Sequence, residues 1–238
     1  MTYPRIYAIH EQALTIAFDD VISESVNATV IAFQKNLEAD PFPGLIEVVP
    51  SYSSLTVYFD PERIPGTITP KELLLQRLAA INQPSGKKGN DGKNDTENYG
   101  NNNWMIPVCY DADFGFDLHW VAEHLGMLPE QVVALHTSMT YRVYMIGFMP
   151  GFAYMGTLPV ELEVPRKNIP AATVPAGSVG LAGKQTGIYP APTPGGWQVI
   201  GRTPLTLFDK KRNPACLLKA GDLVQFTSIS RTAFDQFA

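Results

Sequence analysis

Two pairs of short strand-like segments, each followed by a helical pattern, begin the chain. The strand-like segments are short and rich in apolar residues, and they span residues 5–9, 13–18, 45–49 and 55–59. Residues 23–38 instead place four apolar residues on one stripe, at the spacing of a helix that buries one face: Val26, Val30, Phe33 and Leu37. The pattern predicts a sheet covered by helices.

A second helix is predicted to begin at Pro70. Thr69 and Glu72 have the spacing of a capping box, in which each side chain binds the backbone N–H of the other residue, and proline is favoured at the first helical position. The order strand, strand, helix, strand, strand, helix predicts an α+β sandwich. We assign it to an N-terminal domain of residues 1–84.

The second half of the chain changes from helices to many short strands. A strand at residues 105–110 precedes helices that begin at Asp117, a potential N-cap, and at Pro129. Short apolar segments then alternate with Gly and Pro turns, at residues 141–146, 173–174, 178–181, 197–201, 205–208 and 223–226. This spacing favours a β-barrel or a sandwich, predicted here for a C-terminal domain of residues 104–238.

Residues 85–103 have the composition of a linker between the two domains. The segment contains six Asn and four Gly but no aliphatic side chain. It therefore buries nothing that could offset the entropy lost on ordering. We predict a flexible tether.

Glycine and proline are concentrated in one part of the C-terminal domain. Ten Gly and eight Pro fall in the 55 residues from Gly147 to Gly201, together with many aromatic and aliphatic side chains. Low-complexity disorder lacks such apolar residues, so the segment is predicted to be ordered and rich in loops. These loops fit either a small-molecule cleft or a subunit interface, and composition does not choose between them.

Charge and cysteine content exclude several classes of protein. A net charge of −5 lacks the basic footprint of a nucleic-acid-binding protein. No run of roughly 18 apolar residues predicts a membrane span, and residues 1–20 do not have the pattern of a signal peptide. Cys109 and Cys216 form no CxxC motif, which fits a reduced, cytoplasmic location.

Sequence motifs of common catalytic sites are missing. The chain has no GxGxxG, GxSxG or HExxH. His119 and His124 are five residues apart, so on a helix they point in different directions, and no metal site is predicted. Gly177, Gly180 and Gly183 either expose backbone N–H groups to an anion or serve tight turns.

Two other side chains have chemistry that a site could use. His136 lies between a predicted helix and a predicted strand, where an imidazole acts as a general base, binds an anion or packs in the core. Arg166 lies in a loop region with few carboxylates, where it binds an anionic ligand or lays its stem on aromatic rings. The residues alone leave these alternatives open.

Four stretches of the chain resemble the allophanate hydrolase subunit 1 family, namely GFMPGFAYMG, VPRKNIP, HTSMTYRV and VPAGSVGLAGKQTGIYPAPTPGGWQVIGRTPLTLFD. The resemblance covers the whole chain and is strongest over residues 136–209. This family includes the B subunit of the bacterial ATP-dependent 5-oxoprolinase, which the chain resembles in particular, and the kinase inhibitor KipI. The resemblance implies an α+β N-terminal domain and a cyclophilin-like β-barrel.

The resemblance also implies an activity and partners. Family members act with an allophanate hydrolase subunit 2-type protein (the C subunit) and with the A subunit, and together they open 5-oxoproline to glutamate with hydrolysis of ATP. We expect ATP, with Mg²⁺, in the assembled complex. The alternatives are a KipI-like inhibitor of a sensor histidine kinase and a component of the urea carboxylase or allophanate hydrolase type.

Site residues are implied by the same family motifs. The residues expected to orient the reacting amide are His136, Gln185 and Tyr189, and those expected to bind anionic oxygens are Arg166, Arg202 and Ser178. The interface with a partner is expected to include Phe148, Phe152, Tyr154 and Trp197. The chain departs from the family at Ala171, where arginine is usual, which removes one cation from the expected anion site.

Overall fold

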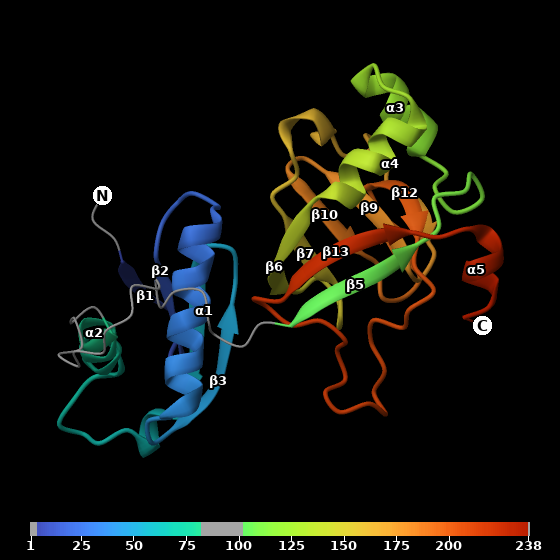
Figure 1. The fold of residues 1–238 in the computed structure, drawn as a ribbon. Coiled ribbons are helices and arrows are strands. Elements are labelled where there is room, and N and C mark those ends of the chain that lie inside the picture. Colours follow the sequence, from blue (N-terminus) through green and yellow to red (C-terminus); the bar gives the residue numbers. More distant parts are fainter. Residues whose placement is uncertain (1–3, 82–101, 238) are drawn as a thin grey trace, which may run out of the picture. The chain divides into compact units, whose positions relative to one another are not determined.

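The chain divides into two compact units, Met1–Gly100 (unit 1) and Asn101–Ala238 (unit 2), in a computed structural model (Figure 1). The structure describes residues 4–81 and 102–237. The predicted linker at residues 85–103 lies outside the described residues except for Asn102 and Asn103. Asn103 is the first residue of a strand.

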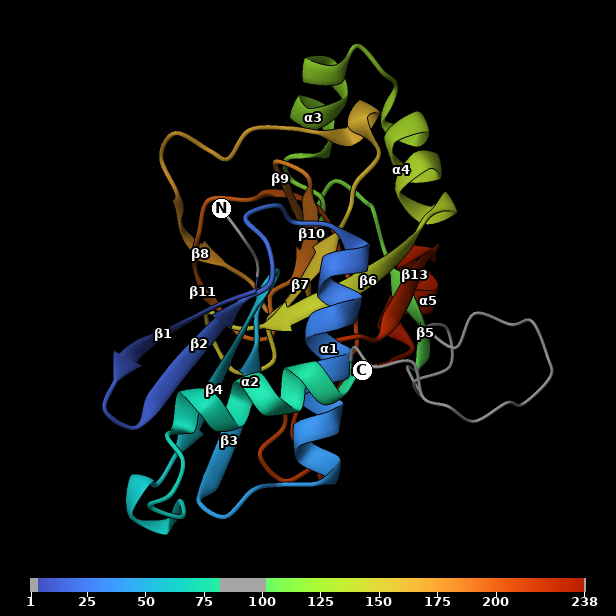
Figure 2. The ribbon, with the colours of Figure 1, turned by 90° about the vertical axis from the view of Figure 1, so that its left-hand side faces the viewer.

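Unit 1 is a four-stranded antiparallel sheet with two helices on one face (Figure 2). Its elements are β1 (Arg5–His10), β2 (Ala13–Ala17), α1 (Glu24–Ala39), β3 (Leu45–Pro50), β4 (Ser54–Phe59), the 3-10 turn η1 (Pro61–Arg63) and α2 (Pro70–Ile81). The strand order is β1-β2-β4-β3. One apolar core joins both helices to the sheet and includes Ile16, Phe33, Leu37, Val57 and Leu74.

The helices of unit 1 begin where capping residues satisfy their free N–H groups. Ser23 Oγ accepts a hydrogen bond from Val26 N, which starts α1. The capping box before α2 is present, with Thr69 N donating to Glu72 Oε2 at 2.9 Å and Glu72 N donating to Thr69 Oγ1 at 3.2 Å. Local sequence thus fixes both helix starts.

A buried asparagine on α1 holds the turn between β3 and β4. Asn27 Nδ2 donates to the carbonyls of Ser51 and Tyr52, each at 3.2 Å. We expect Asn27→Ala to lower the free energy of unfolding of unit 1 by about 2 kcal/mol, because two buried acceptors lose their donor. Denaturant unfolding followed by far-UV circular dichroism measures this change.

The matched control for that substitution is Asn36→Ala, an exposed position on the same helix, with an expected change within about 0.5 kcal/mol. All three tryptophans lie in unit 2 (Trp104, Trp120 and Trp197). Their fluorescence transition should therefore stay unchanged. A circular dichroism transition equal to that of the wild type would contradict the role given to Asn27.

Unit 2 is built mainly from short strands, with two helices near its start and one near its end. Its elements are β5 (Asn103–Val108), α3 (Leu118–Leu125), α4 (Pro129–Ser138), β6 (Thr140–Ile146), β7 (Ala153–Gly156), the 3-10 turn η2 (Val160–Leu162), β8 (Ala171–Val174), β9 (Ser178–Ala182), β10 (Gln185–Ile188), β11 (Thr193–Gly195), β12 (Gln198–Arg202), β13 (Leu223–Ser228) and α5 (Arg231–Asp235).

Seven of these strands form one curled sheet of order β12-β9-β10-β7-β6-β13-β5, and β8 pairs separately with β11. β13 pairs with β5 in parallel and with β6 antiparallel. The two outer strands meet because Cys109 and Arg202 exchange backbone hydrogen bonds of 2.9 Å in both directions. The sheet is thereby closed at one residue pair, and we call it the barrel.

The strand predicted at residues 205–208 is wrong. Only Phe208 forms an isolated bridge, with Cys216. The guanidinium of Arg212 donates to the carbonyls of Thr206 and Leu207, at 3.1 and 3.0 Å. The Leu207 carbonyl also accepts from Leu217 N at 2.8 Å, so backbone pairing is confined to the residues around the bridge. The Arg212 side chain takes the Thr206 carbonyl that a longer strand would use, and the segment remains a loop.

Neither unit contains, in its described residues, a helix long and apolar enough to cross a membrane. The core of unit 2 instead fills the barrel, with buried side chains from both the sheet and the helices, such as Ile106, Val121, Val143, Leu181 and Phe226. The ends of the strands and the loops that follow them position the candidate site, although some loop residues, such as Leu207, enter this core.

Candidate functional site

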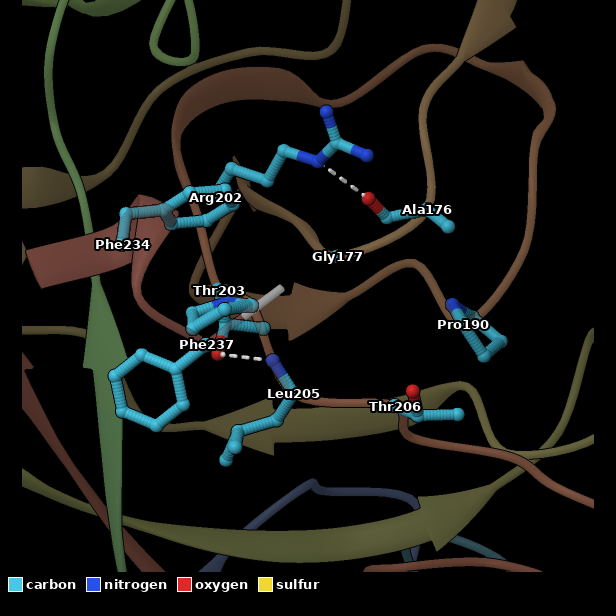
Figure 3. Close-up of a pocket in the computed structure, with 10 residues that line it drawn as sticks. Ala176, Gly177, Pro190, Arg202, Thr203, Leu205, Thr206, Phe234 and Phe237 are labelled. Carbon is cyan, nitrogen blue, oxygen red and sulfur yellow. Dashed lines mark hydrogen bonds between the residues drawn. The ribbon is translucent and has the colours of Figure 1, made fainter. Parts of the chain in front are cut away.

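A cavity of ≈ 320 Å³ opens in unit 2 at the end of the barrel where β9 begins and β10 and β12 end (Figure 3). Its walls come from the turn before β9, the loop after β12 and the C-terminal segment, and include Gly177, Pro190, Arg202, Leu205, Phe234 and Phe237. We call it the Arg202 pocket. Its volume lies at the lower end of the range for small-molecule sites.

Arg202 is the one charged side chain among the described residues that line this pocket. Its Nε donates to the Ala176 carbonyl at 2.7 Å. Neither of its Nη groups makes a hydrogen bond or an ion pair with the described part of the chain. The guanidinium carbon lies 5.7 Å from the ring centroid of Phe114. The end of the guanidinium is thus available to an anion.

The C-terminal segment forms an apolar side of the pocket through Phe234 and Phe237. The Phe234 ring packs on Phe114, with centroids 4.4 Å apart. Arg231 covers the same ring, its guanidinium carbon 4.4 Å from the Phe114 centroid, and forms an ion pair with Asp113 at 3.2 Å. These contacts hold α5 against Phe114, and α5 carries the Phe234 side of the pocket.

Five aromatic side chains gather elsewhere in unit 2. This aromatic cluster consists of Phe148, Phe152, Tyr154, Tyr189 and Trp197, and the Phe152 ring lies 4.7–5.6 Å from the other four centroids. Phe148 is 64% exposed and adopts a left-handed φ of 62°, which is rare for a residue with a side chain. Phe152 and Trp197 are buried. Of the predicted interface residues, Phe148 and part of Tyr154 therefore reach the surface, supported by the others.

Arg166 lies beside this cluster and does not line the Arg202 pocket. Its guanidinium carbon is 5.9 Å from the Trp197 ring centroid, and its side chain is exposed. The neighbouring Lys167 forms an ion pair with Asp117 at 2.6 Å and donates its backbone N–H to the Gly196 carbonyl. Asp117 also accepts from Val199 N, so its side chain anchors the Arg166 loop and does not cap α3.

His136 is in the core of unit 2, with no exposed surface. Its Nδ1 lies 2.9 Å from the Tyr110 hydroxyl and its Nε2 3.1 Å from Thr186 Oγ1. The imidazole stacks on Phe226, with centroids 4.5 Å apart. Burial lowers the pKa of His136 to about 3, so the ring is neutral near pH 7. This position corresponds to the core-packing alternative.

The remaining predicted site residues lie on strands of the barrel or directly after one. Gln185 is half-buried on β10 and Tyr189 is buried after it, and neither lines the Arg202 pocket. Burial raises the pKa of the Tyr189 hydroxyl, and the positive charge of Arg166 acts in the opposite direction. Ser178 lies directly opposite Arg202 in the pairing of β9 with β12. Its hydroxyl is buried and has no hydrogen-bond partner in the described chain.

The glycine N–H groups that could have bound an anion are used within the fold. Gly177 N donates to the Tyr189 carbonyl and Gly183 N donates to the Val164 carbonyl, both at 2.7 Å. The described residues also contain no group of three or more His, Cys, Asp or Glu side chains arranged to hold a metal ion. Charge for an anion therefore comes from arginine.

Comparison with known proteins identifies the family of the chain. The family model "Carboxyltransferase domain, subdomain C and D" matches residues 4–218. The chain belongs to this family.

Relatives of this carboxyltransferase-family chain include the B subunit of 5-oxoprolinase from Bacillus subtilis (strain 168). The two are 41% identical over 244 residues, which cover 98% of this chain and 96% of the relative. The expected membership of the family of KipI and the B subunit of 5-oxoprolinase is thereby confirmed.

Solved structures show the same carboxyltransferase fold within longer chains. TTHA0988 is 35% identical, with a TM-score of 0.76 over 92% of this chain and 40% of that chain. The urea carboxylase of Kluyveromyces lactis is 17% identical, with a TM-score of 0.70 over 98% of this chain and 22% of that chain. This chain thus spans less than half the length of either protein.

Sequence reasoning on this carboxyltransferase-family chain missed the phenylalanine side of the pocket. Ser230 is a recognisable N-cap, and its Oγ accepts from Ala233 N at 3.2 Å, so α5 itself could have been found. No local pattern indicates that Phe234 and Phe237 meet Arg202. That contact depends on the path of the whole barrel.

Proposed function

We propose that the chain is the B subunit of an ATP-dependent 5-oxoprolinase, inactive without its partners. The observation that carries this proposal is the 41% identity, over nearly all of both chains, to a protein named as the B subunit of 5-oxoprolinase. The proposed partners are a subunit 2-type protein (the C subunit) and the A subunit. The proposed location is the cytoplasm, and the proposed class of the unit 2 sheet is a cyclophilin-like barrel.

The chemistry explains why ATP would be required. A lactam amide is a poor electrophile, because its nitrogen donates electrons to the carbonyl. Transfer of a phosphoryl group from ATP to the lactam oxygen creates a leaving group, after which water opens the ring and releases phosphate. We propose that ATP binds with Mg²⁺ in the assembled complex. Arg166 and Arg202, neither of them paired with a described carboxylate, are proposed to hold anionic oxygens.

We propose further that the partner docks over Phe148 and Arg166, the exposed parts of the aromatic cluster and its rim. A left-handed φ costs a residue like Phe148 roughly 1–2 kcal/mol. The Phe148 ring is nevertheless left largely in water, so the isolated chain gains no burial energy that would offset the backbone strain. A partner that covers the ring would make the arrangement favourable.

The test is co-expression with the A and C subunits of the same enzyme. We expect one heteromer on size exclusion and an ATPase activity that depends on 5-oxoproline and on all three chains. Phe148→Ser should weaken assembly at least about tenfold, as expected for loss of an aromatic anchor. The matched control is Leu128→Ser, because Leu128 is similarly exposed and lies outside the aromatic cluster.

Separate elution of the three proteins at micromolar concentration would argue against the subunit role. Inhibition of a histidine kinase by the isolated chain, without oxoproline-dependent ATPase in the mixture, would favour the KipI-like alternative. Equal assembly of Phe148→Ser and Leu128→Ser would remove the aromatic cluster from the interface and leave the enzymatic proposal intact.

A further inference from the structure

We infer that the Arg202 pocket is a binding site for a small carboxylate with an apolar ring or chain, and that Phe234 and Phe237 are part of this site. The inference rests on the proposed function for the choice of 5-oxoproline as the molecule to test. The charge, the lining and the size of the pocket support it independently of that function.

Arg202 carries a positive charge that no carboxylate of the described chain balances. Arg202 is half-buried, and no carboxylate among the described residues lies within ion-pair distance of it. Its Nε bond to the Ala176 carbonyl fixes the plane of the guanidinium and leaves both Nη groups free. A planar guanidinium with two free donors matches the two oxygens of a carboxylate. The pocket is therefore suited to an anion.

A second polar group accompanies the arginine. Ser178 is 1% exposed, and its Oγ has no hydrogen-bond partner in the described chain. Because Ser178 and Arg202 are directly opposite in an antiparallel pair, their side chains project from the same face of the sheet. A buried hydroxyl without a partner is unfavourable, so a polar position lies beside Arg202 on this face, although Ser178 is not among the described residues that line the pocket.

The rest of the lining combines apolar side chains with two threonines, Thr203 and Thr206. Phe234, Phe237, Leu205 and Pro190 present rings and methyl groups where a carboxylate would turn its other end. The ≈ 320 Å³ cavity admits a molecule of amino-acid size. Among the described residues, no lining side chain carries a negative charge that would attract a free amino group. A cyclic amide with a carboxylate, which has no ammonium group, fits this pattern.

The experiment measures binding to the full chain by isothermal titration calorimetry, with three probes. 5-Oxoproline is expected to bind. 2-Pyrrolidinone, the same lactam without the carboxylate, is expected to bind at least about tenfold more weakly, as is typical when a charge-assisted hydrogen bond is lost. Inorganic phosphate, an anion without an apolar part, is expected to bind more weakly than 5-oxoproline.

Three variants locate the bound molecule. Arg202→Gln should weaken 5-oxoproline binding at least about tenfold and leave 2-pyrrolidinone binding unchanged. Phe237→Ala, at an exposed position whose loss should not affect folding, should weaken it by roughly fivefold. The charge-matched control is Lys210→Gln, an exposed lysine outside the pocket, which should bind like the wild type.

Equal binding of 5-oxoproline to the wild type and to both pocket variants would overturn the inference, as would preference for phosphate. The assembled complex separates this failure from failure of the proposed function. Oxoproline-dependent ATPase with an unchanged KM for 5-oxoproline in Arg202→Gln would retain the enzyme and reject the pocket. Arg202-dependent binding by a chain whose complex has no such ATPase would retain the pocket and reject the enzyme.

Discussion

Acidification from pH 7 to pH 4 is expected to lower the free energy of unfolding of unit 2 by about 3 kcal/mol through His136 alone. Burial lowers the pKa of this imidazole to about 3 in the folded chain, against 6.5 for a free histidine. The unfolded chain therefore binds the proton first. The contribution is fully present above pH 6.5 and is lost as the pH falls toward 3.

The physical cause is the closed environment of the ring. Its neighbours are Tyr110, Thr186, Tyr141 and Phe226, none of which carries a negative charge that could stabilise an imidazolium. Tryptophan fluorescence during urea unfolding at several pH values measures the effect, because all the tryptophans lie in unit 2.

His136→Gln separates this titration from that of other groups. Glutamine keeps a neutral hydrogen-bonding side chain, so the variant should be less stable at pH 7 and should lose less stability on acidification. His119→Gln, at an exposed position, should follow the wild type. If the free energy of unfolding depended on pH in the same way in the wild type and in His136→Gln, the pKa of His136 would be the same in the folded and the unfolded chain, which would contradict the prediction.

The second large effect is expected from Gly177→Ala, which should destabilise unit 2 by roughly 3–5 kcal/mol, the sum of backbone strain and overpacking. Gly177 has a φ of +80°, and a Cβ there would lie 2.3 Å from the Thr203 carbonyl oxygen. Both residues line the Arg202 pocket, and Thr203 N donates to the Gly177 carbonyl. The methyl group therefore pushes two walls of the pocket apart.

Gly183→Ala is the matched control. Gly183 also has a positive φ, of +55°, but no atom of the described chain lies within 4 Å of the position that a methyl group would take, so only the strain of about 1 kcal/mol should remain. Urea midpoints of the two variants give the comparison. Similar midpoints would mean that the 203–206 loop moves freely and that the pocket wall is not rigid.

Sequence periodicity predicted those elements that bury one continuous face. The predicted helix at residues 23–38 corresponds to α1, because Val30, Phe33 and Leu37 all enter one core. The apolar residues at 205–208 misled, because Leu207 is in the core and Leu205 packs against it while the backbone between them stays in a loop. β7 and β10 were not predicted, since they lie in glycine-rich segments without regular alternation.

The site was predictable only as far as single residues carry their own chemistry. Arg202 was singled out by its motif, and it lines the pocket. His136 was singled out in the same way, but its burial depends on the packing of α4 on β13, which no local pattern contains. The same limit applies to Phe237, whose neighbours come from distant parts of the chain.

The parallel pairing of β5 with β13 has a consequence for how unit 2 is made. Asn103 pairs with Leu223, so β5 meets its neighbour in the described sheet about 120 residues later in the chain. Contacts of such high contact order form slowly. During synthesis, Ile106 and Val108 have no sheet partner until residues 223–228 leave the ribosome. The sheet of unit 2 is therefore completed only after residue 228 has been synthesised, whereas all the strand pairings of unit 1 are complete in sequence by Phe59.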